Sequence, residues 1–325
     1  MSDAPSLAID VHRGVPIGAA GEHQVRVGTA SWTDKTLIAC RRFYPKGATS
    51  AEARLRHYAS QFPIVEVDSS YYAMPTPETA QLWAERTPAG FVMNVKAFRL
   101  FTGHQTGARV LHADLRQALG VADPATFFYG DVPGEIRAEL WRRFREALLP
   151  LRGAGKLGLV HFQFPPWLTC DAAGRAQVEH CAEQMTGFDV SAEFRHRSWL
   201  GDAERESTIA FLRERELAHT VVDGPQGFVN CVPAIWETTH PRFALVRLHG
   251  RNARTWNIRG ASSASDRFNY DYPQSELSEL VPRVENLAVR AMQTHVIFNN
   301  NMEDQGQRNA RSLTGLLARR FPAMA

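Results

Sequence analysis

The sequence has little lysine, little cysteine and no long apolar segment. Only Lys35, Lys46, Lys96 and Lys156 are lysines, and arginine supplies the rest of the 37 basic residues. The formal net charge is only +3, so the chain as a whole carries no signature of polyanion binding. No apolar run approaches the roughly 18 residues of a membrane span, and the first residues lack the regions of a signal peptide. We therefore expect no membrane as a partner.

The four cysteines are Cys40, Cys170, Cys181 and Cys231. No two of them have C-x-x-C spacing, so neither a zinc clip nor a redox-active dithiol is predicted. Together with the missing signal peptide, this usage predicts a soluble protein of the reducing cytoplasm. No feature of the chain allows a protein partner to be inferred.

Short apolar segments recur after residue 23 and predict eight β-strands, at 25–32, 64–71, 91–98, 157–164, 189–195, 218–223, 243–249 and 294–300. Helical patterns separate most of them, at 50–61, 77–87, 135–149, 174–186, 205–216, 274–292 and 306–320. Alternating strands and helices with nearly continuous apolar strands are typical of parallel βα units. The sequence therefore predicts an α/β fold, a (β/α)8 TIM barrel, as a single domain over 24–325 behind an irregular lead-in at 1–23.

Three local features refine this prediction. A doubly wound open sheet is the alternative, but residues 28–32 do not match the glycine-rich turn that usually follows its first strand. No clear helix fits between strands six and seven, so helix six is predicted to be weak or absent. The connections at 99–133 and 251–273, after strands three and seven, are long and follow strands, which places them at the barrel face where active sites form.

Polar residues end seven of the eight strands. Strand side chains alternate between faces, so residues two apart point the same way. Pairs of this kind are Asn94 with Lys96, His161 with Gln163, Glu193 with Arg195, and Arg247 with His249. The apolar neighbours of these residues would then face the helices; they are Val95, Phe162, Phe194 and Leu248. We expect the polar set inside the barrel near its C-terminal mouth, where it forms either a binding site or a structural network of paired charges.

The mixture of charges indicates a class of ligand. Lys96, Arg195 and Arg247 predict an anionic ligand, most readily one with phosphate, because arginine offers a bidentate fork and lysine a point charge. Glu193 or Asp68 is the candidate general acid or base, and Lys96 would neutralise developing charge.

Aromatic residues follow several of the same strands. Trp32, Tyr72 and Trp199 could stack on a sugar or a base, or could simply pack. The segment 251–272 interleaves arginines, including Arg254 and Arg259, with aromatic residues, a pattern typical of nucleotide or nucleic-acid lids and also found in plain surface loops.

A divalent metal is a further alternative. The candidate ligands are Asp68, His161, Glu193, His196 and His249. Ligands from separate strands need no fixed spacing, so the sequence pattern cannot decide. The neighbouring lysine and arginines would repel a cation, and we leave the cofactor unknown, with none or a divalent metal as the two readings.

A series of motifs resembles the YecE-like family, also called domain of unknown function 72. They lie at 28–32, 43–45, 58–59, 67–72, 83–97, 162–166, 193–199, 246–250, 270–272 and 298–301. The resemblance runs from about residue 25 to 320 and implies a TIM-type barrel and a pocket, without implying a reaction. Matched motif by motif, it implies a pocket made of Trp32, Ser69, Lys96, Gln163, Glu193, Arg195, Trp199, Arg247, His249 and Asn299.

The chain departs from the family pattern in two places. The family usually has His-Pro-Ser-Trp after the strand-five arginine, whereas this chain has Arg197 in place of the proline. After the last strand, residues 302–308 differ from the usual family segment, so the final loop is the part least defined by the resemblance.

These features predict an enzyme of the hydrolase or lyase type that acts by general acid/base chemistry on an anionic, phosphate-bearing ligand. The catalytic candidates are Glu193, Lys96, Asp68 and His249. The binding candidates are Arg195, Arg247, Gln163, Asn299, Asn300, Trp32, Ser69, Tyr72, Trp199 and Asp223. Two alternatives remain: a nucleic-acid-binding or repair-associated module that uses 251–272, and a non-catalytic sensor of small molecules. The expected partner is accordingly an anionic small molecule or a nucleic-acid fragment.

Overall fold

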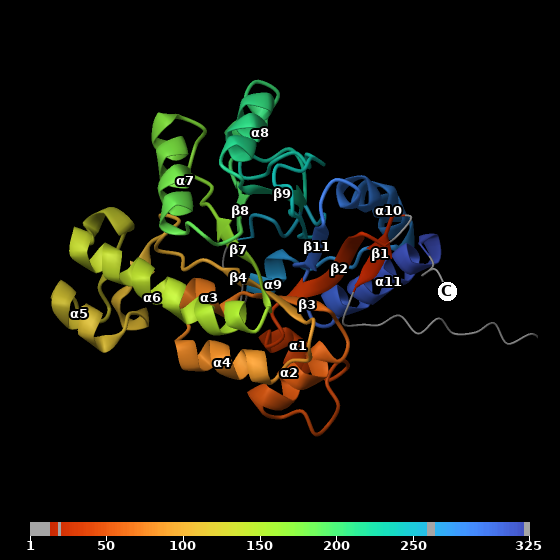
Figure 1. The fold of residues 1–325 in the computed structure, drawn as a ribbon, viewed down its shortest axis with the longest axis horizontal. Coiled ribbons are helices and arrows are strands. Elements are labelled where there is room, and N and C mark those ends of the chain that lie inside the picture. The colour runs from red at the N-terminus through yellow and green to blue at the C-terminus, as the bar shows by residue number, and fades with distance from the viewer. Residues whose placement is uncertain (1–13, 19–20, 259–263, 322–325) are drawn as a thin grey trace, which may run out of the picture.

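Eight parallel strands close into a barrel in the computed structural model, which describes residues 14–18, 21–258 and 264–321. The strands are β2 (His23–Ala30), β3 (Ile64–Val67), β4 (Val92–Lys96), β7 (Leu157–Gln163), β8 (Val190–Glu193), β9 (Ala218–Asp223), β10 (Phe243–Leu248) and β11 (Gln293–Phe298). Neighbours pair in the order β2-β11-β10-β9-β8-β7-β4-β3, and β3 pairs back with β2 (Figure 1). The predicted TIM barrel is confirmed.

Seven helices surround the barrel at the predicted places. They are α2 (Ala51–Ala59), α4 (Pro77–Glu85), α6 (Gly134–Gly153), α7 (Ala172–Gln184), α8 (Arg205–Glu214), α10 (Gln274–Ala288) and α11 (Gln305–Arg320). Their ends differ from the sequence prediction by at most four residues. Between β9 and β10 every residue is described and none is helical, as predicted. No helix in the described part of the chain is long and apolar enough to cross a membrane.

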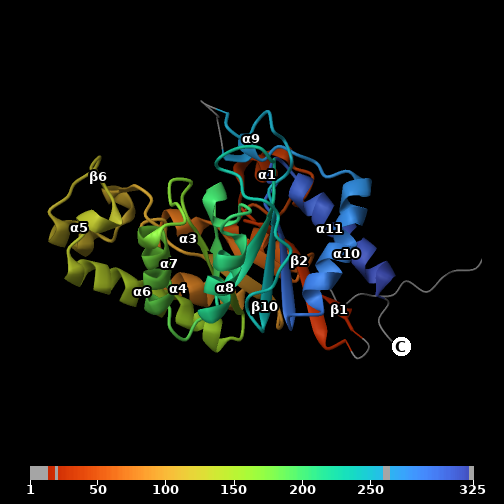
Figure 2. The same cartoon turned by 90° about the horizontal axis from the view of Figure 1, so that it is seen from above.

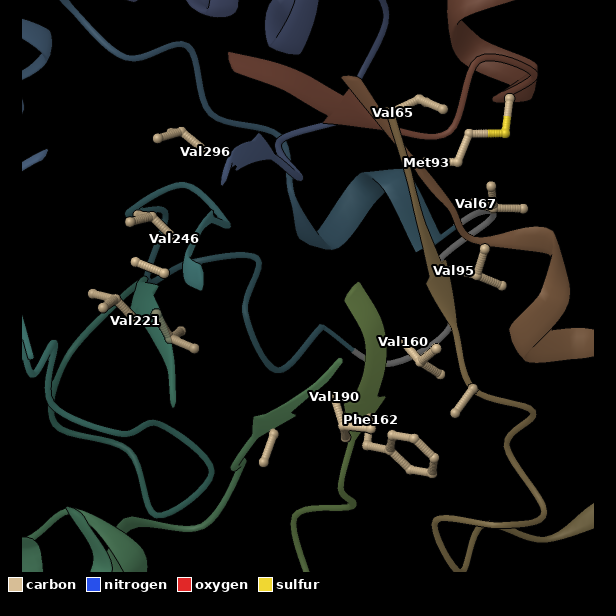
Figure 3. Close-up of a cluster of buried hydrophobic side chains, with 14 of the residues drawn as sticks. Val65, Val67, Met93, Val95, Val160, Phe162, Val190, Val221, Val246 and Val296 are labelled. Atoms are coloured by element: carbon tan, nitrogen blue, oxygen red, sulfur yellow. The ribbon is translucent and has the colours of Figure 1, made fainter. Parts of the chain in front are cut away.

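Each barrel strand has one face toward the helices and one toward the barrel interior. The outward set packs in one large apolar cluster and includes Val65, Val95, Val160, Phe162, Val246 and Val296 (Figure 3). A second, separate cluster joins residues of the other parity: Ala30, Ile64, Val92, Leu159, Ala218, Phe243, Leu245 and Ile297. These inward residues fill the barrel below the mouth. The polar residues that follow them at the same parity therefore line the interior toward the C-terminal ends of the strands.

The lead-in is partly regular, which corrects the expectation of an irregular segment. Val15–Ile17 forms β1, antiparallel to the first residues of β2. The physical reason lies in the pairing of β2 with β3, which involves only Thr29 and Ala30 of β2. Without β1, the first half of β2 would have an unpaired edge on the side of β3. β1 fills this edge and buries Val15 and Ile17. Residues 1–13 lie outside the described part of the chain.

The second barrel strand is shorter than predicted. It ends at Val67, and Ser69–Tyr72 forms the single helical turn α3 instead of continuing the strand to residue 71. The hydroxyl of Ser70 lies 2.7 Å from the Val67 carbonyl oxygen and 2.6 Å from that of Lys96. A buried side chain that bonds back to the backbone in this way favours a turn over a strand. The turn places Tyr71 and Tyr72 at the barrel mouth.

The two long connections differ in content. Residues 99–133 build a small lobe with β5 (Thr106–Gly107), β6 (Thr126–Phe127) and α5 (Ala113–Leu119) beside α6. Residues 251–273 contain only the short helix α9 (Ala264–Arg267) in their described part. In Figure 2, α9 lies with α1 (Lys35–Cys40) at one end of the barrel, and β1 lies toward the other end. The hydroxyl of Ser265 donates to Asp34, the residue that caps α1, at 2.8 Å.

Closure of the barrel depends on Gly28, and this generates a stability prediction. A Cβ at residue 28 would lie 2.1 Å from the carbonyl oxygen of Ile64 on the neighbouring strand. We expect Gly28→Ala to lower the free energy of unfolding by about 1–3 kcal/mol, since β2 and β3 must move apart. Gly47→Ala is the control, because no atom lies within 4 Å of its added Cβ. Urea unfolding measures both, and equal stability of the two variants would contradict the prediction.

Candidate functional site

Arg247 of β10 is the centre of the polar interior. Its side chain is fully buried, with Nη1 2.5 Å from Glu193 Oε2 and Nη2 2.6 Å from Glu66 Oε1. The side-chain oxygens of Gln163 and Asn299 each accept a longer bond, at 3.3 Å. Strands β3, β7, β8 and β10 and the residue that follows β11 are thereby joined around one guanidinium. Glu66 is not among the site residues that the sequence predicts.

Glu193 of β8 is enclosed by cations and imidazoles. Arg195 Nε lies 2.5 Å from Oε1, and the Nε2 atoms of His161 and His249 each lie 3.4 Å from one of the carboxylate oxygens. Burial by itself would raise the pKa of Glu193, but the charges of Arg195 and Arg247 hold it well below its usual value. Glu193 is therefore ionised and has no exposed surface. This state suits a fixed counter-ion and does not suit a general acid.

The amide of Asn299 orients His249. Asn299 Oδ1 accepts from Arg247, so its Nδ2 must be the group that donates to His249 Nδ1, at 2.8 Å. The neutral ring then carries its proton on Nε2, the atom that faces Glu193. Burial, with a contribution from Arg195, lowers the pKa of His249 to about 3. His249 is thus uncharged at neutral pH and directs an N–H at the carboxylate.

Lys96 of β4 and Asp68 form a second ion pair, nearer the opening. Lys96 Nζ lies 2.8 Å from Asp68 Oδ1 and 4.5 Å from the centre of the Tyr71 ring. Burial would raise the pKa of Asp68, but Lys96 keeps it below its usual value. The side chain of Asp68 is 26% exposed, whereas those of Glu66 and Glu193 are 0% exposed. Of the three inner carboxylates, Asp68 is the one that a ligand can reach.

Arg99 adds a cation that sequence reasoning missed. The charges of the other inner residues balance: the cations Lys96, Arg195 and Arg247 pair with the carboxylates Glu66, Asp68 and Glu193. The guanidinium of Arg99 lies 5.4 Å from the Tyr71 ring centre, and no acidic side chain pairs with it among the described residues. Burial and the charges of Arg99, Lys96 and Arg195 lower the pKa of His104 to about 4. These cations therefore act together on His104, beside Tyr71 at the mouth.

The aromatic residues of 251–272 point into the molecule. Trp256 is 3% exposed, and its ring lies 6.1 Å from that of His249. The Phe268 ring stacks on His249 at 5.5 Å and lies 6.0 Å from the Trp256 ring, and the Tyr272 hydroxyl donates to Asp223 at 2.8 Å. This segment covers the mouth with its aromatic side chains. Arg254 is exposed, and Arg259 lies outside the described residues.

Four predicted binding residues do not line the mouth. Trp199 is fully buried on the helix side, stacked 4.0 Å from Phe194, which itself faces outward. Asn300 has the parity opposite to Asn299 and donates to Asn309 of α11. Asp223 is bound by Arg251 and Tyr272 and anchors 251–272. Trp32 packs edge-on against Trp83 of α4. These positions correct the sequence prediction, and each follows from a packing or pairing partner that strand alternation does not reveal.

The other candidates lie where they were expected, at the mouth. Gln163, Asn299, Arg195, Arg247, Glu193 and His249 form one connected network, and Lys96 and Asp68 form a separate ion pair. Ser69 and Tyr72 lie on the rim, exposed, in α3.

The set of residues considered for a metal is not assembled. His196 lies in the turn after β8, where its Nδ1 bonds to Ser198. Within 14–18, 21–258 and 264–321, no group of three or more His, Cys, Asp or Glu side chains is arranged to hold a metal ion. The imidazoles near Glu193 face the carboxylate together with two guanidinium groups, an environment that disfavours a cation.

Comparisons with known proteins extend over nearly the whole chain. A model of the family described as "Protein of unknown function DUF72" matches residues 26–324. The UPF0759 protein YunF of Bacillus subtilis is 30% identical over 303 residues, which cover 93% of this chain and 97% of that protein. A DUF72 family structure from Enterococcus faecalis aligns with a TM-score of 0.73 at 24% identity, covering 90% of this chain and 95% of that one. Another from Thermotoga maritima has a TM-score of 0.69 at 27% identity, with 91% and 99% covered.

Glu193→Gln tests the role of the buried counter-ion. The substitution leaves Arg247 and Arg195 in the barrel interior with less compensating charge, so we expect the free energy of unfolding to fall by about 3–5 kcal/mol. Glu139→Gln is the matched control, because Glu139 pairs with Arg142 and Arg143 on the surface of α6 and should cost less than about 1 kcal/mol. The two are compared by urea unfolding at neutral pH. A Glu193→Gln protein as stable as the control would refute the assignment.

The neutral state of His249 predicts a dependence of stability on pH. The pKa of this group falls from an ordinary 6.5 to about 3 on folding. Between these values the unfolded chain binds a proton that the folded chain does not, so stability is complete above pH 6.5 and decreases as the pH falls toward 3. Between pH 7 and pH 5, we expect the free energy of unfolding to fall by about 2 kcal/mol less in His249→Asn than in the wild type. Urea unfolding at the two pH values measures this, and identical losses would contradict it.

Proposed function

We propose that this chain, which belongs to the DUF72 family of proteins of unknown function, is an enzyme with its active site at the barrel mouth. The ligand is a small anion that bears phosphate, and the reaction is of the hydrolase or lyase type with general acid/base catalysis. The buried network around Arg247 holds the site in shape, and the groups nearer the opening meet the ligand.

The position of Arg99 at the opening carries this proposal. The inner charges pair off, but Arg99 has no acidic partner among the described residues, and it lies against Tyr71 with Lys96. Arg195 uses Nε for Glu193, its guanidinium lies 5.5 Å from the centre of the Trp256 ring, and its side chain is 12% exposed; no acidic side chain of the described chain pairs with its outer nitrogens. A phosphate group would supply the missing counter-charge and could accept bonds from guanidinium donors in their preferred fork geometry.

Asp68 is the group that the geometry favours as the general base. It is the inner carboxylate with solvent access, and it is ionised because Lys96 lies beside it. The same pairing weakens it as a base. A bound phosphate would compete for the ammonium of Lys96 and so make Asp68 a stronger proton acceptor when the ligand is present. Glu193, the first catalytic candidate from the sequence, instead fixes Arg195 and Arg247 in position.

The two alternatives fit the structure less closely. A nucleic-acid-binding surface on 251–272 would need aromatic side chains turned outward for stacking. Trp256 and Tyr272 are buried, so the described part of this segment offers exposed arginines without such rings. A sensor that binds the anion without converting it has the same binding residues and differs only in the use of Asp68.

Arg99→Met tests the binding step. We expect the affinity for inorganic phosphate, measured by isothermal titration calorimetry at low salt, to fall about 10- to 100-fold, because a charge-assisted contact is lost. Arg254→Met is the control, since Arg254 is exposed on the segment that covers the mouth. If Arg254→Met weakens binding and Arg99→Met does not, the alternative on 251–272 is favoured.

Asp68→Asn separates the enzyme from the sensor. We expect this variant to bind phosphate as well as the wild type does, because the amide removes a repelling charge, while turnover of phosphate monoesters in a substrate panel falls by at least about 100-fold. Turnover that survives in Asp68→Asn would remove Asp68 from the proposed mechanism.

A further inference from the structure

Four aromatic rings follow one another along the rim of the mouth. Tyr72 and Tyr71 belong to α3, His104 follows β4, and Trp167 follows β7. Successive ring centres are 5.0 Å, 5.4 Å and 5.4 Å apart. The outer members are unusually open for large side chains, with Tyr72 48% and Trp167 59% exposed. Rings from three separate loops thus form one row, and neither end of it is covered by the described chain.

The row lies beside the cations of the mouth. Lys96 and Arg99 are both against the Tyr71 ring, at 4.5 Å and 5.4 Å from its centre. His104 adds no positive charge of its own, because its pKa is lowered to about 4 by burial and by these neighbours. Its Nδ1 is bonded to the Thr102 hydroxyl at 2.9 Å, which fixes the ring. The row therefore offers π-faces, with the His104 ring held in place, next to a site for negative charge.

A cleft of about 320 Å³ adjoins Trp167, between the loops after β4 and β7 and the start of α7. The polar side chains around it are already bonded within the protein: Thr102 to Arg99 O, Thr169 to Asp171, Asp171 to Gly174 N, and Gln177 to Phe101 O. A sugar ring needs free donors and acceptors for its hydroxyl groups, and few remain here. A flat ring that binds by stacking needs none.

We propose that this aromatic row is the base-binding part of a nucleotide site, with the base stacked on Trp167 and the phosphate held by Arg99, Lys96 and Arg195. The inference rests on the proposed function and narrows its substrate class from phosphate-bearing anions to nucleotides. Because recognition is by stacking and the nearby polar groups are occupied, purine and pyrimidine nucleotides should differ in affinity through ring size more than through hydrogen bonding.

Three probes separate the base from the phosphate: adenosine 5′-monophosphate, ribose 5-phosphate and inorganic phosphate, each titrated into the full-length protein by calorimetry. We expect the wild type to bind the nucleotide about 10- to 100-fold more tightly than ribose 5-phosphate, the range that one stacked base contributes. Trp167→Ala should abolish this difference and leave the affinity for inorganic phosphate unchanged. Trp167→Phe should keep most of the difference in affinity between the nucleotide and ribose 5-phosphate, since a smaller π-face remains.

Phe128→Ala is the matched control, because Phe128 is a 44% exposed aromatic residue on the lobe, in another part of the surface. It should leave all three affinities unchanged. If the nucleotide binds no better than ribose 5-phosphate, and Arg99→Met weakens both, the nucleotide inference is wrong and the proposed anion site stands. If none of the three probes binds the wild type, the proposed function fails and this inference fails with it.

Discussion

A buried ion pair between Arg247 and Glu193 is the interaction on which the upper half of the barrel depends. Both side chains are 0% exposed, and a single unpaired charge at that depth would cost several kcal/mol. Glu66 and Arg195 complete the charge balance, and amides from Gln163 and Asn299 supply further contacts. None of β3, β7, β8, β10 and β11 can shift relative to the others without breaking one of these bonds. The pair thus fixes the positions of the strand ends and, through them, of the loops above.

This network divides the mouth into two layers with different capacities. The lower layer is closed and electrically balanced, and its imidazoles remain neutral because burial disfavours their charged form. The upper layer contains Asp68, Lys96 and Arg99 with the aromatic rim, and it has both access to solvent and a surplus of positive charge. A competing explanation, in which the polar residues are only a structural network, describes the lower layer well. It does not explain an arginine without an acidic partner beside a row of open rings.

The sequence predicted the barrel and its polar interior because both follow from periodicity. Strand alternation correctly predicted that Lys96, Glu193 and Arg247 face inward and that Phe194 faces outward. It could not place Trp199, whose position is decided by stacking on Phe194, a contact that no strand parity encodes. Arg99, His104 and Trp167 were missed because they follow strand ends in loops, which have no period. An arginine three residues after an inward lysine, and a tryptophan directly after a Pro-Pro turn, were the available signals.

The chemistry of a pH response follows from the same two layers. Glu193 is ionised between pH 5 and pH 8, since its cations hold its pKa well below the usual value, and His249 is neutral there, since burial lowers its pKa to about 3. Neither can be the source of an activity change between pH 5 and pH 8. Any such change must come from the upper layer or from the ligand itself, and a phosphate monoester, with a second ionisation near pH 6, titrates in that window. The pH response would then follow the ionisation of the bound phosphate.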